Sequence, residues 1–224
     1  RDKHVTGVQT CALPICATSI LLATGNPAKQ QKLAWLVEAI NLSPTTPQQL
    51  SLSGVPEEEG STHHEIARAK AREWSLAGST LAIASDGGLV LPALGDSWES
   101  LYTHRFAGPA ANDQERTRRL LELMEPYQGG EREASWVEGL CVADRGRILA
   151  SWELRGGTGI ISEAPDSAPA IPGFWAFSVW YFPQFGRTYN QLTPVELESL
   201  DDHWTSLRRL VRRYFQSHFV STKR

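Results

Sequence analysis

The sequence predicts an α/β protein with a mixed central sheet, and three observations support this. In the first half of the chain, short apolar runs alternate with segments of helical periodicity. Further on, two β-rich runs, 135–143 and 147–155, are joined by Asp144-Arg145-Gly146, which is the pattern of a hairpin. The last long segment, 203–219, has apolar residues on one helical face and arginines on the other. Alternating strands and helices followed by a hairpin indicate a sheet with both parallel and antiparallel strands.

The first strand and the first helix are joined by a turn that is suited to bind an anion. An apolar run at 20–23 breaks at Thr24-Gly25-Asn26-Pro27, and helical spacing of apolar residues follows over 33–40. Gly25 allows close approach of the backbone, and Pro27 suits the first turn of a helix. With Lys29 in that turn, the helix N-terminus predicts a phosphate site. The alternative is an ordinary βα turn with a solvated lysine, because the Gly-Lys-Ser/Thr of a P-loop is missing.

The remaining elements follow from caps and turn residues. Thr62, with Glu65 three residues on, predicts a capped helix to about Ala77, and Asn112 with Glu115 predicts another that reaches Met124. Four further segments are expected to be extended: 49–53, 80–84, 89–94 and the aromatic run 174–182. Loops or turns are expected at 41–48, 54–60 and 85–88.

Composition and charge exclude several classes of function. A net charge of −3 and a pI of about 6.1 give no global basic field, so we expect no nucleic-acid partner. No apolar run reaches the length of a transmembrane helix, so we expect no membrane partner either. The three cysteines, Cys11, Cys16 and Cys141, are too few and too scattered for a disulfide framework. They favour a reducing compartment, and we expect a cytoplasmic protein.

At 224 residues the chain is long enough for a sizeable core, and we expect one α/β domain over 17–219. Residues 1–16 begin RDKHVTGVQTCALPI, which looks like a translated sequencing-adapter tail rather than native sequence. We therefore exclude them from the predicted domain, and we expect 220–224 to be a short tail.

Three features could converge into a site. They are the anion-binding turn, the acidic run Glu57-Glu58-Glu59, and Asp86, which we expect at the carboxyl end of an apolar strand. A phosphate cradle with carboxylates nearby suggests Mg²⁺ bridging phosphate oxygens, and a carboxylate there can orient or deprotonate a water. The alternatives are a solvated acidic loop and a simple turn at 85–88.

Three blocks of the sequence resemble the inosine triphosphatase family. The first, ATGNPAK at 23–29, matches that family's A-T-G-N-x-x-K. The second, EEEGSTHHEIARAKA at 57–71, resembles E-E-x-G-x-T-F-x-E-N-A-x-x-K-A. The third, ASDGGL at 84–89 with ALG at 93–95 and RFAG at 105–108, resembles A-D-D-S-G-L, A-L-G-G and A-R-Y-A-G. The blocks occur in the family's order, and the match covers most of 19–215.

The resemblance implies an enzyme that hydrolyses nucleoside triphosphates of deaminated purines, such as ITP and XTP, to monophosphate and pyrophosphate with Mg²⁺. It also implies a homodimer of two-lobed α/β subunits with the site in the cleft between the lobes. By position, Asp86 matches the general base and a metal ligand, and Glu57 matches a second metal ligand. The positions that match residues around the phosphates are Thr24, Gly25, Asn26, Lys29, Glu65 and Lys70.

Departures from the family pattern concentrate at the end that should read the base. The family's F-G-Y-D or F-G-W-D loop corresponds to Phe174-Trp175-Ala176-Phe177, which lacks the aspartate. The late S-H-R corresponds to Ser206-Leu207-Arg208, which lacks the histidine, although Arg208 is still expected to reach the nucleotide. Phe174 and Trp175 could stack on a base, or they could belong to an aromatic core strand.

The other departures lie near the phosphate end. The first aspartate and the serine of D-D-S-G are Ser85 and Gly87, and we assign Gly87 to the substrate site by its position. The phenylalanine and asparagine of the second block are His63 and Ile66. A site that has lost polar readers should discriminate less between bases, so we expect altered or relaxed base choice.

The predicted function is therefore a Mg²⁺-dependent nucleoside triphosphate pyrophosphatase. One alternative is a degenerate family member that binds nucleotides without turnover, which the missing aspartates and histidine favour. The other is a Maf-like nucleotide pyrophosphatase, which shares the general fold. The Ser-Pro-Arg-Arg type of opening that is usual after its first strand is absent here.

Overall fold

The computed structural model describes residues 18–54, 60–169 and 171–219. The adapter-like segment, the C-terminal tail and the predicted metal ligand Glu57 lie outside these described residues. No helix within the described part of the chain is long and apolar enough to cross a membrane. The predicted α/β class with a mixed sheet is confirmed by an eight-stranded sheet with flanking helices.

The sheet has a parallel part and an antiparallel part. Its order is β2-β1-β3-β4-β6-β7-β8, and β5 pairs with β4 outside this path. β1 is parallel to both β2 and β3, and the remaining pairs are antiparallel. The strands are β1 (Thr18–Leu22), β2 (Leu42–Thr45), β3 (Leu81–Val90), β4 (Glu133–Asp144), β5 (Arg147–Arg155), β6 (Gly159–Ile161), β7 (Trp180–Phe182) and β8 (Arg187–Thr188).

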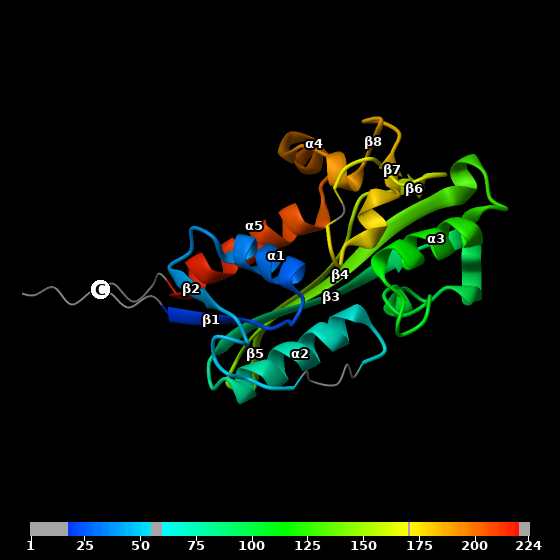
Figure 1. The fold of residues 1–224 in the computed structure, drawn as a ribbon. Helices are drawn as coiled ribbons and strands as arrows, with labels where there is room; N and C mark the ends of the chain where they lie inside the picture. The colour runs from blue at the N-terminus through cyan, green and yellow to red at the C-terminus, as the bar shows by residue number, and fades with distance from the viewer. Residues whose placement is uncertain (1–17, 55–59, 170, 220–224) are drawn as a thin grey trace, which may run out of the picture.

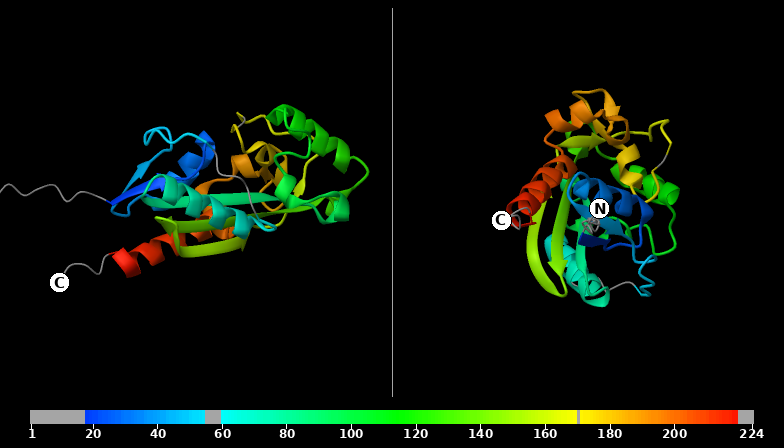
Figure 2. Two further views of the ribbon diagram at one scale, coloured as in Figure 1. Left: turned by 90° about the horizontal axis from the view of Figure 1, so that it is seen from below. Right: turned by 90° about the vertical axis from the view of Figure 1, so that its left-hand side faces the viewer.

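Helices cover both faces of this sheet (Figure 1). The elements form two lobes, which are joined by the long central strands. In the first lobe, α2 (His63–Ala77) packs on one face of β3, β4 and β5, while α1 (Pro27–Val37) and α5 (His203–Phe219) pack together on the other. The second lobe contains α3 (Asp113–Met124), the short strands β6, β7 and β8, and α4 (Pro194–Ser199). The long strand β4 runs from one lobe into the other, as the left-hand view in Figure 2 shows.

The predicted helix caps are present, with one difference. Asn112 and Glu115 form the expected capping box of α3. Thr62 accepts a hydrogen bond from the Glu65 amide and so caps α2. The Glu65 carboxylate, however, binds the amide and hydroxyl of Ser61 instead of the Thr62 amide. Glu65 therefore holds Ser61, the residue before the helix cap, instead of completing the capping box.

The predicted break at 85–88 is wrong, because β3 continues through it. Asp86 pairs with Gly139, and Gly87 pairs with Glu138, in one unbroken antiparallel register with β4. Two glycines in succession looked like a turn, but they are required by close packing. A Cβ on Gly87 would lie 1.9 Å from Glu138 Oε2, and a Cβ on Gly88 would lie 2.0 Å from the Ser100 carbonyl oxygen. Glycine is the residue that permits such contacts within a strand.

Two other local predictions also differ from the structure. The strand β2 lies at Leu42–Thr45, inside the predicted loop, and the predicted strand at 49–53 is a turn and bend. The aromatic run 174–182 is partly helical, since a 3₁₀ turn, η4 (Trp175–Ser178), precedes β7. In both cases short segments carried too little periodicity to separate strand from turn.

Candidate active site

The carboxylate of Asp86 is the centre of a buried polar cluster between β3 and α2. Its Oδ2 lies 2.6 Å from His63 Nδ1, and its Oδ1 accepts a hydrogen bond of 2.8 Å from Lys70 Nζ. The other ring nitrogen of His63, Nε2, lies 3.0 Å from Ser100 Oγ. Because α2 packs directly on β3, His63 and Lys70, two turns apart on one helical face, both reach the same aspartate.

Positive charge keeps Asp86 ionised in spite of its burial. Burial alone would raise the pKa of this carboxyl. The hydrogen bond with His63 and the charges of Lys29 and Lys70 outweigh that effect and lower its pKa from 3.8 to about 2. Asp86 is therefore a carboxylate at any physiological pH, and its remaining lone pairs can still accept a hydrogen bond from water or bind a cation.

The turn before α1 is preorganised by its own side chains. Asn26 caps the helix, and its Oδ1 accepts hydrogen bonds from the amides of Ala28 (2.9 Å) and Lys29 (3.3 Å). The Asn26 amide in turn donates to Thr24 Oγ1 at 3.2 Å. Because Asn26 already uses two amides of the helix N-terminus, the Lys29 ammonium becomes the main positive group that the turn can offer an anion.

This turn lies beside Asp86 because of the sheet. β1 ends at Leu22, opposite Ile83 of β3, and the turn begins there while β3 continues to Asp86. The electrostatic effect of Lys29 on the Asp86 carboxyl reflects the same proximity. Asp86 is thus at the predicted edge, the carboxyl end of the parallel strands, even though its own strand does not end there.

The opposite face of β3 carries a second buried polar group. Ser85, Gly87 and Glu138 share this face, since side chains alternate along a strand. Glu138 is fully buried, its Oε2 accepts a hydrogen bond of 2.7 Å from Trp136 Nε1, and its Oε1 has no hydrogen-bond partner among the described residues. Gly87 therefore faces Glu138 and points away from the Asp86 cluster.

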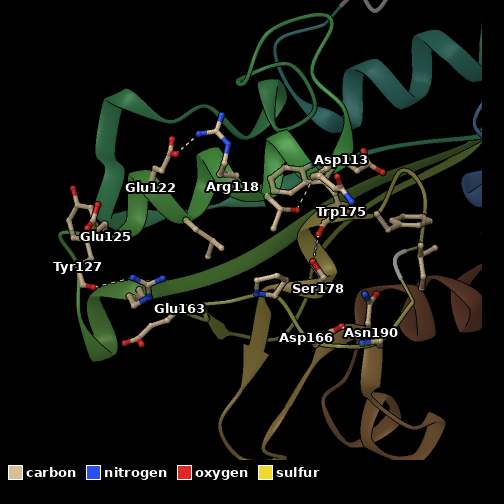
Figure 3. A pocket seen from close by; sticks show the side chains of 18 of the residues that line it. Asp113, Arg118, Glu122, Glu125, Tyr127, Glu163, Asp166, Trp175, Ser178 and Asn190 are labelled. Carbon is tan, nitrogen blue, oxygen red and sulfur yellow. Dashed lines mark hydrogen bonds and ion pairs between the residues drawn. The ribbon is translucent and has the colours of Figure 1, made fainter.

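Two cavities are lined by residues of the second lobe. The larger one, of about 1130 Å³, lies between α3 and the segment 163–178, and its lining carries more acidic than basic side chains (Figure 3). The acidic residues are Asp113, Glu122, Glu125, Glu163 and Asp166, and the basic ones are Arg118 and Arg132. This excess of negative charge disfavours a triphosphate, so we do not place the phosphates in this cavity although it is the larger one.

The smaller cavity, of about 360 Å³, lies between the lobes and follows α1. Ala28, Gln31, Lys32 and Trp35 line it from α1, and Phe174, Phe177, Tyr189 and Asn190 line it from the second lobe. It shares Ile171, Phe174 and Asn190 with the larger cavity. At its end near the turn the two lobes touch, because a Cβ on Gly173 would lie 2.4 Å from Asn26 Nδ2.

The structure brings most of the predicted site residues together. Lys70 binds Asp86 directly, and Thr24, Gly25, Asn26 and Lys29 form the adjoining turn. Phe174 lines both cavities, whereas Trp175 lines the larger one and stacks on Phe106 at 5.6 Å.

Three predicted residues lie apart from this group. Gly87 faces Glu138 on the opposite face of β3. Arg208 stacks over Trp35 at 4.1 Å and pairs with Glu38, beyond the end of α1. Glu65 is exposed and engaged with Ser61, and these hydrogen bonds lower its carboxyl pKa.

Sequence reasoning did not assign a role to two histidines. His63 was noted only as a departure from the family's phenylalanine, although a histidine one residue after the cap of a helix beside a buried aspartate was the available signal. His203, the first residue of α5, is fully buried, and its Nδ1 lies 3.2 Å from Asp202 Oδ1.

A metal ion would find few ligands among the described residues. No group of three or more His, Cys, Asp or Glu side chains in that part of the chain could hold a metal. Asp86 is the carboxylate at the phosphate turn, and Lys29 and Lys70 balance its charge. Such a site fits Mg²⁺, which needs only one or two carboxylates when water and substrate phosphates supply the other ligands.

A preorganised anion turn beside an ionised aspartate, at the carboxyl edge of a mixed sheet, defines a nucleotide-binding α/β protein of the phosphate-hydrolase class. The sequence profile of the Ham1 family matches residues 20–212, and the chain belongs to this family. The predicted resemblance to the inosine triphosphatase family is thereby confirmed.

Similar proteins cover nearly all of the chain. A dITP/XTP pyrophosphatase of Thermus thermophilus is 32% identical over 195 residues, which are 87% of this chain and 91% of that protein. A dITP/XTP pyrophosphatase of Leptospira interrogans is 30% identical over 204 residues, which are 91% and 98% of the two chains. Among solved structures, a HAM1 protein from Coxiella burnetii has a TM-score of 0.71 at 26% identity and covers 88% of this chain and 99% of its own.

Proposed function

We propose that this protein is a nucleoside triphosphate pyrophosphatase that hydrolyses the bond between the α- and β-phosphates. The observation that carries the proposal is the position of Asp86 next to the turn that ends in Lys29. Family membership and the names of the relatives support the reaction class.

Each group at the turn has a distinct task in this proposal. Lys29 holds the β- and γ-phosphates, with Thr24, Gly25 and Asn26 shaping the backbone around them. Asp86 accepts a hydrogen bond from the attacking water, whose oxygen bonds to the α-phosphorus while pyrophosphate leaves. Because its pKa of about 2 makes Asp86 a weak base, it acts mainly by orienting the water and by attracting its proton as the new bond forms.

His63 and Lys70 are positioning residues in this scheme. They occupy one carboxylate oxygen each and so fix the plane of the Asp86 carboxylate against β3. We propose that Mg²⁺ is held by Asp86 and by Glu57, the ligand inferred from the resemblance. When bound, Mg²⁺ would neutralise charge on the phosphate oxygens.

The finer features are proposals as well. We propose a cytoplasmic homodimer, with the base stacked on Phe174 in the smaller cavity and its choice altered relative to the family. Nucleotide binding without turnover remains a second candidate, favoured by the serine at position 85 where the family has aspartate.

The test is pyrophosphate release from ITP, XTP, dUTP, dTTP and ATP with Mg²⁺. The expected result is release from at least one triphosphate. Arg213→Met is a suitable control variant, because Arg213 is exposed on α5, away from the site. Measurable binding without release from any triphosphate would overturn the enzyme and support the second candidate.

A further inference from the structure

A carboxylate of the second lobe holds the segment that touches the phosphate turn. This carboxylate belongs to Asp113, the first residue of α3. Its Oδ2 accepts a hydrogen bond of 2.8 Å from the Gly173 amide, and its Oδ1 accepts one of 2.8 Å from Arg116 Nη1. Because both carboxylate oxygens are engaged, the Gly173 amide is fixed relative to α3.

The segment around Gly173 packs on Asn26, in the phosphate turn of the first lobe. Gly173 has a φ of +84°, and a Cβ there would lie 2.4 Å from Asn26 Nδ2. Glycine is the residue that combines this backbone conformation with so close an approach. The same Asn26 side chain caps α1 through the amides of Ala28 and Lys29. Gly173 therefore lies directly against the group that shapes the anion turn.

Arg116 ties Asp113 to a second segment that lies beside the turn. Arg116 is 6% exposed, and its Nε donates a hydrogen bond of 2.7 Å to the His104 carbonyl oxygen. Burial and the charges of Arg116 and Lys29 lower the pKa of the His104 ring. The charge of Lys29 acts on His104 because this segment also lies near the turn. The pair of Asp113 and Arg116 thus connects two parts of the second lobe that meet the phosphate turn.

The residue that follows Gly173 is Phe174, which lines the smaller cavity. Phe174 is buried, and its ring stacks on Phe177 at 5.0 Å, so its position follows that of the segment. The contact between Gly173 and Asn26 therefore sets how far Phe174 lies from the turn. A ligand that binds at both places must span this separation, and it binds best when the separation is fixed in advance.

We infer that Asp113 is a positioning residue for the nucleotide, which holds Gly173 on Asn26 and so fixes the separation between the phosphate turn and Phe174. This inference rests on the proposed function, in which the triphosphate tail lies at the turn and the ring at Phe174. Asp113 acts through Gly173 and not through contact with the ligand. Its loss should weaken the binding of a whole nucleotide, but not of a triphosphate tail alone, which needs only the turn.

The test is isothermal titration calorimetry with Mg²⁺ and two ligands, a non-hydrolysable inosine triphosphate analogue and inorganic tripolyphosphate. In Asp113→Ala the Kd of the analogue should rise at least about tenfold, as expected for the loss of a charge-assisted hydrogen bond, while the Kd of tripolyphosphate should stay within about twofold. Asp113→Asn, whose amide oxygen can still accept the Gly173 hydrogen bond, should retain most of the affinity for the analogue.

Three further variants accompany the test. Glu122→Ala removes another carboxylate of α3, which pairs with Arg118 on the exposed side of the helix, and should bind both ligands as the wild type does. Lys29→Met should weaken both ligands, because the tail of each lies at the turn. Asp113→Ser is too short to reach Gly173 and should give the same pattern as Asp113→Ala, so it replaces that variant if alanine prevents folding.

The outcomes separate this inference from the proposed function. If folded Asp113→Ala or Asp113→Ser changes both Kd values by the same factor, or changes neither, the inference is wrong. If no triphosphate releases pyrophosphate but binding shows the expected pattern, the enzyme proposal fails and the inference stands. If Lys29→Met leaves tripolyphosphate binding unchanged, the phosphates do not lie at the turn, and the proposed function and the inference both fail.

Discussion

The Nδ1 atom of His63 lies 2.6 Å from Oδ2 of Asp86, so the family's phenylalanine position carries a histidine that holds the candidate catalytic carboxylate. The same ring reaches Ser100 through its second nitrogen. In the tautomer with its proton on Nδ1, the His63 ring donates a hydrogen bond to Asp86, and Nε2 accepts one from the Ser100 hydroxyl. Both nitrogens of this buried ring then have a hydrogen-bond partner. This contact makes the ionisation of Asp86 depend on α2 as well as on β3.

Replacing His63 should move the acid limb of the activity profile. In His63→Phe, Asp86 loses a hydrogen bond that lowers its pKa, while burial continues to raise it. The acid limb of kcat/KM should therefore shift to higher pH. In His63→Asn, which retains a donor, the shift should be smaller.

The measurement is a profile of kcat/KM from about pH 4 to pH 8, within the range where the variants remain folded. Because the pKa of Asp86 is about 2, the wild type should show no acid limb from Asp86 in this range, whereas His63→Phe should lose activity toward its acid end. A His63→Phe profile as flat as that of the wild type would contradict the role given to this hydrogen bond. Circular dichroism at each pH excludes unfolding as the cause.

Asp202 should stabilise the fold above about pH 4 and lose this effect in acid. Burial would raise the pKa of this carboxyl. The pairing with His203 and the hydrogen bonds from Tyr189 and the Thr205 amide outweigh burial and lower its pKa to about 2. Because the folded-state pKa is below the unfolded value, the stabilisation is complete above the unfolded pKa and disappears as pH falls toward 2.

Urea unfolding of the wild type and Asp202→Asn measures this effect. At pH 7 the variant should lose about 2 kcal/mol of unfolding free energy, and the difference should shrink steadily below about pH 4. A difference that is constant between pH 7 and pH 3 would show that the charge of Asp202 is not what stabilises the folded state.

Restoring the family's serine at position 87 should destabilise this chain. A side chain there would overlap Glu138, whose Oε2 lies 1.9 Å from the Cβ position. We expect Gly87→Ser to lower the unfolding free energy by about 1–3 kcal/mol. Combined with Glu138→Ala, which removes the obstructing carboxylate, the same change should be less damaging.

A double-mutant cycle of thermal or urea unfolding checks the coupling. The two single variants and the double variant give an interaction free energy, which should favour the double variant. Additive effects would mean that Gly87 and Glu138 do not share the space that the strand register gives them.

Long periodic elements could be predicted from the sequence, and short ones could not. The hairpin of β4 and β5, the caps of α2 and α3, and helix α5 have enough residues to repeat a pattern. The continuity of β3 could not be predicted, because two successive glycines are typical of a turn. In the structure, Gly87 and Gly88 instead leave room for the Glu138 side chain and the Ser100 carbonyl, which come from other segments of the chain. Contacts of this kind appear only when the partner strands are in place.

The candidate site shows the same division. The phosphate turn is a local motif, so Thr24 to Lys29 could be recognised in one stretch. The link between Asp86, His63 and Lys70 depends on α2 packing across β3, and the cavity beside α1 depends on the second lobe, which contributes Phe174, Tyr189 and Asn190 to its lining. Neither follows from residue spacing in a single segment.

The measurement that tests the central claim most directly is pyrophosphate release by Asp86→Asn with Mg²⁺ under single-turnover conditions, with enzyme in excess over triphosphate and concentrated enough to bind all of it. Asparagine keeps the size of the side chain but cannot attract a proton from water. We predict that the rate falls at least about 100-fold while the variant stays folded. An Asp86→Asn protein that releases pyrophosphate at the wild-type rate would contradict the account.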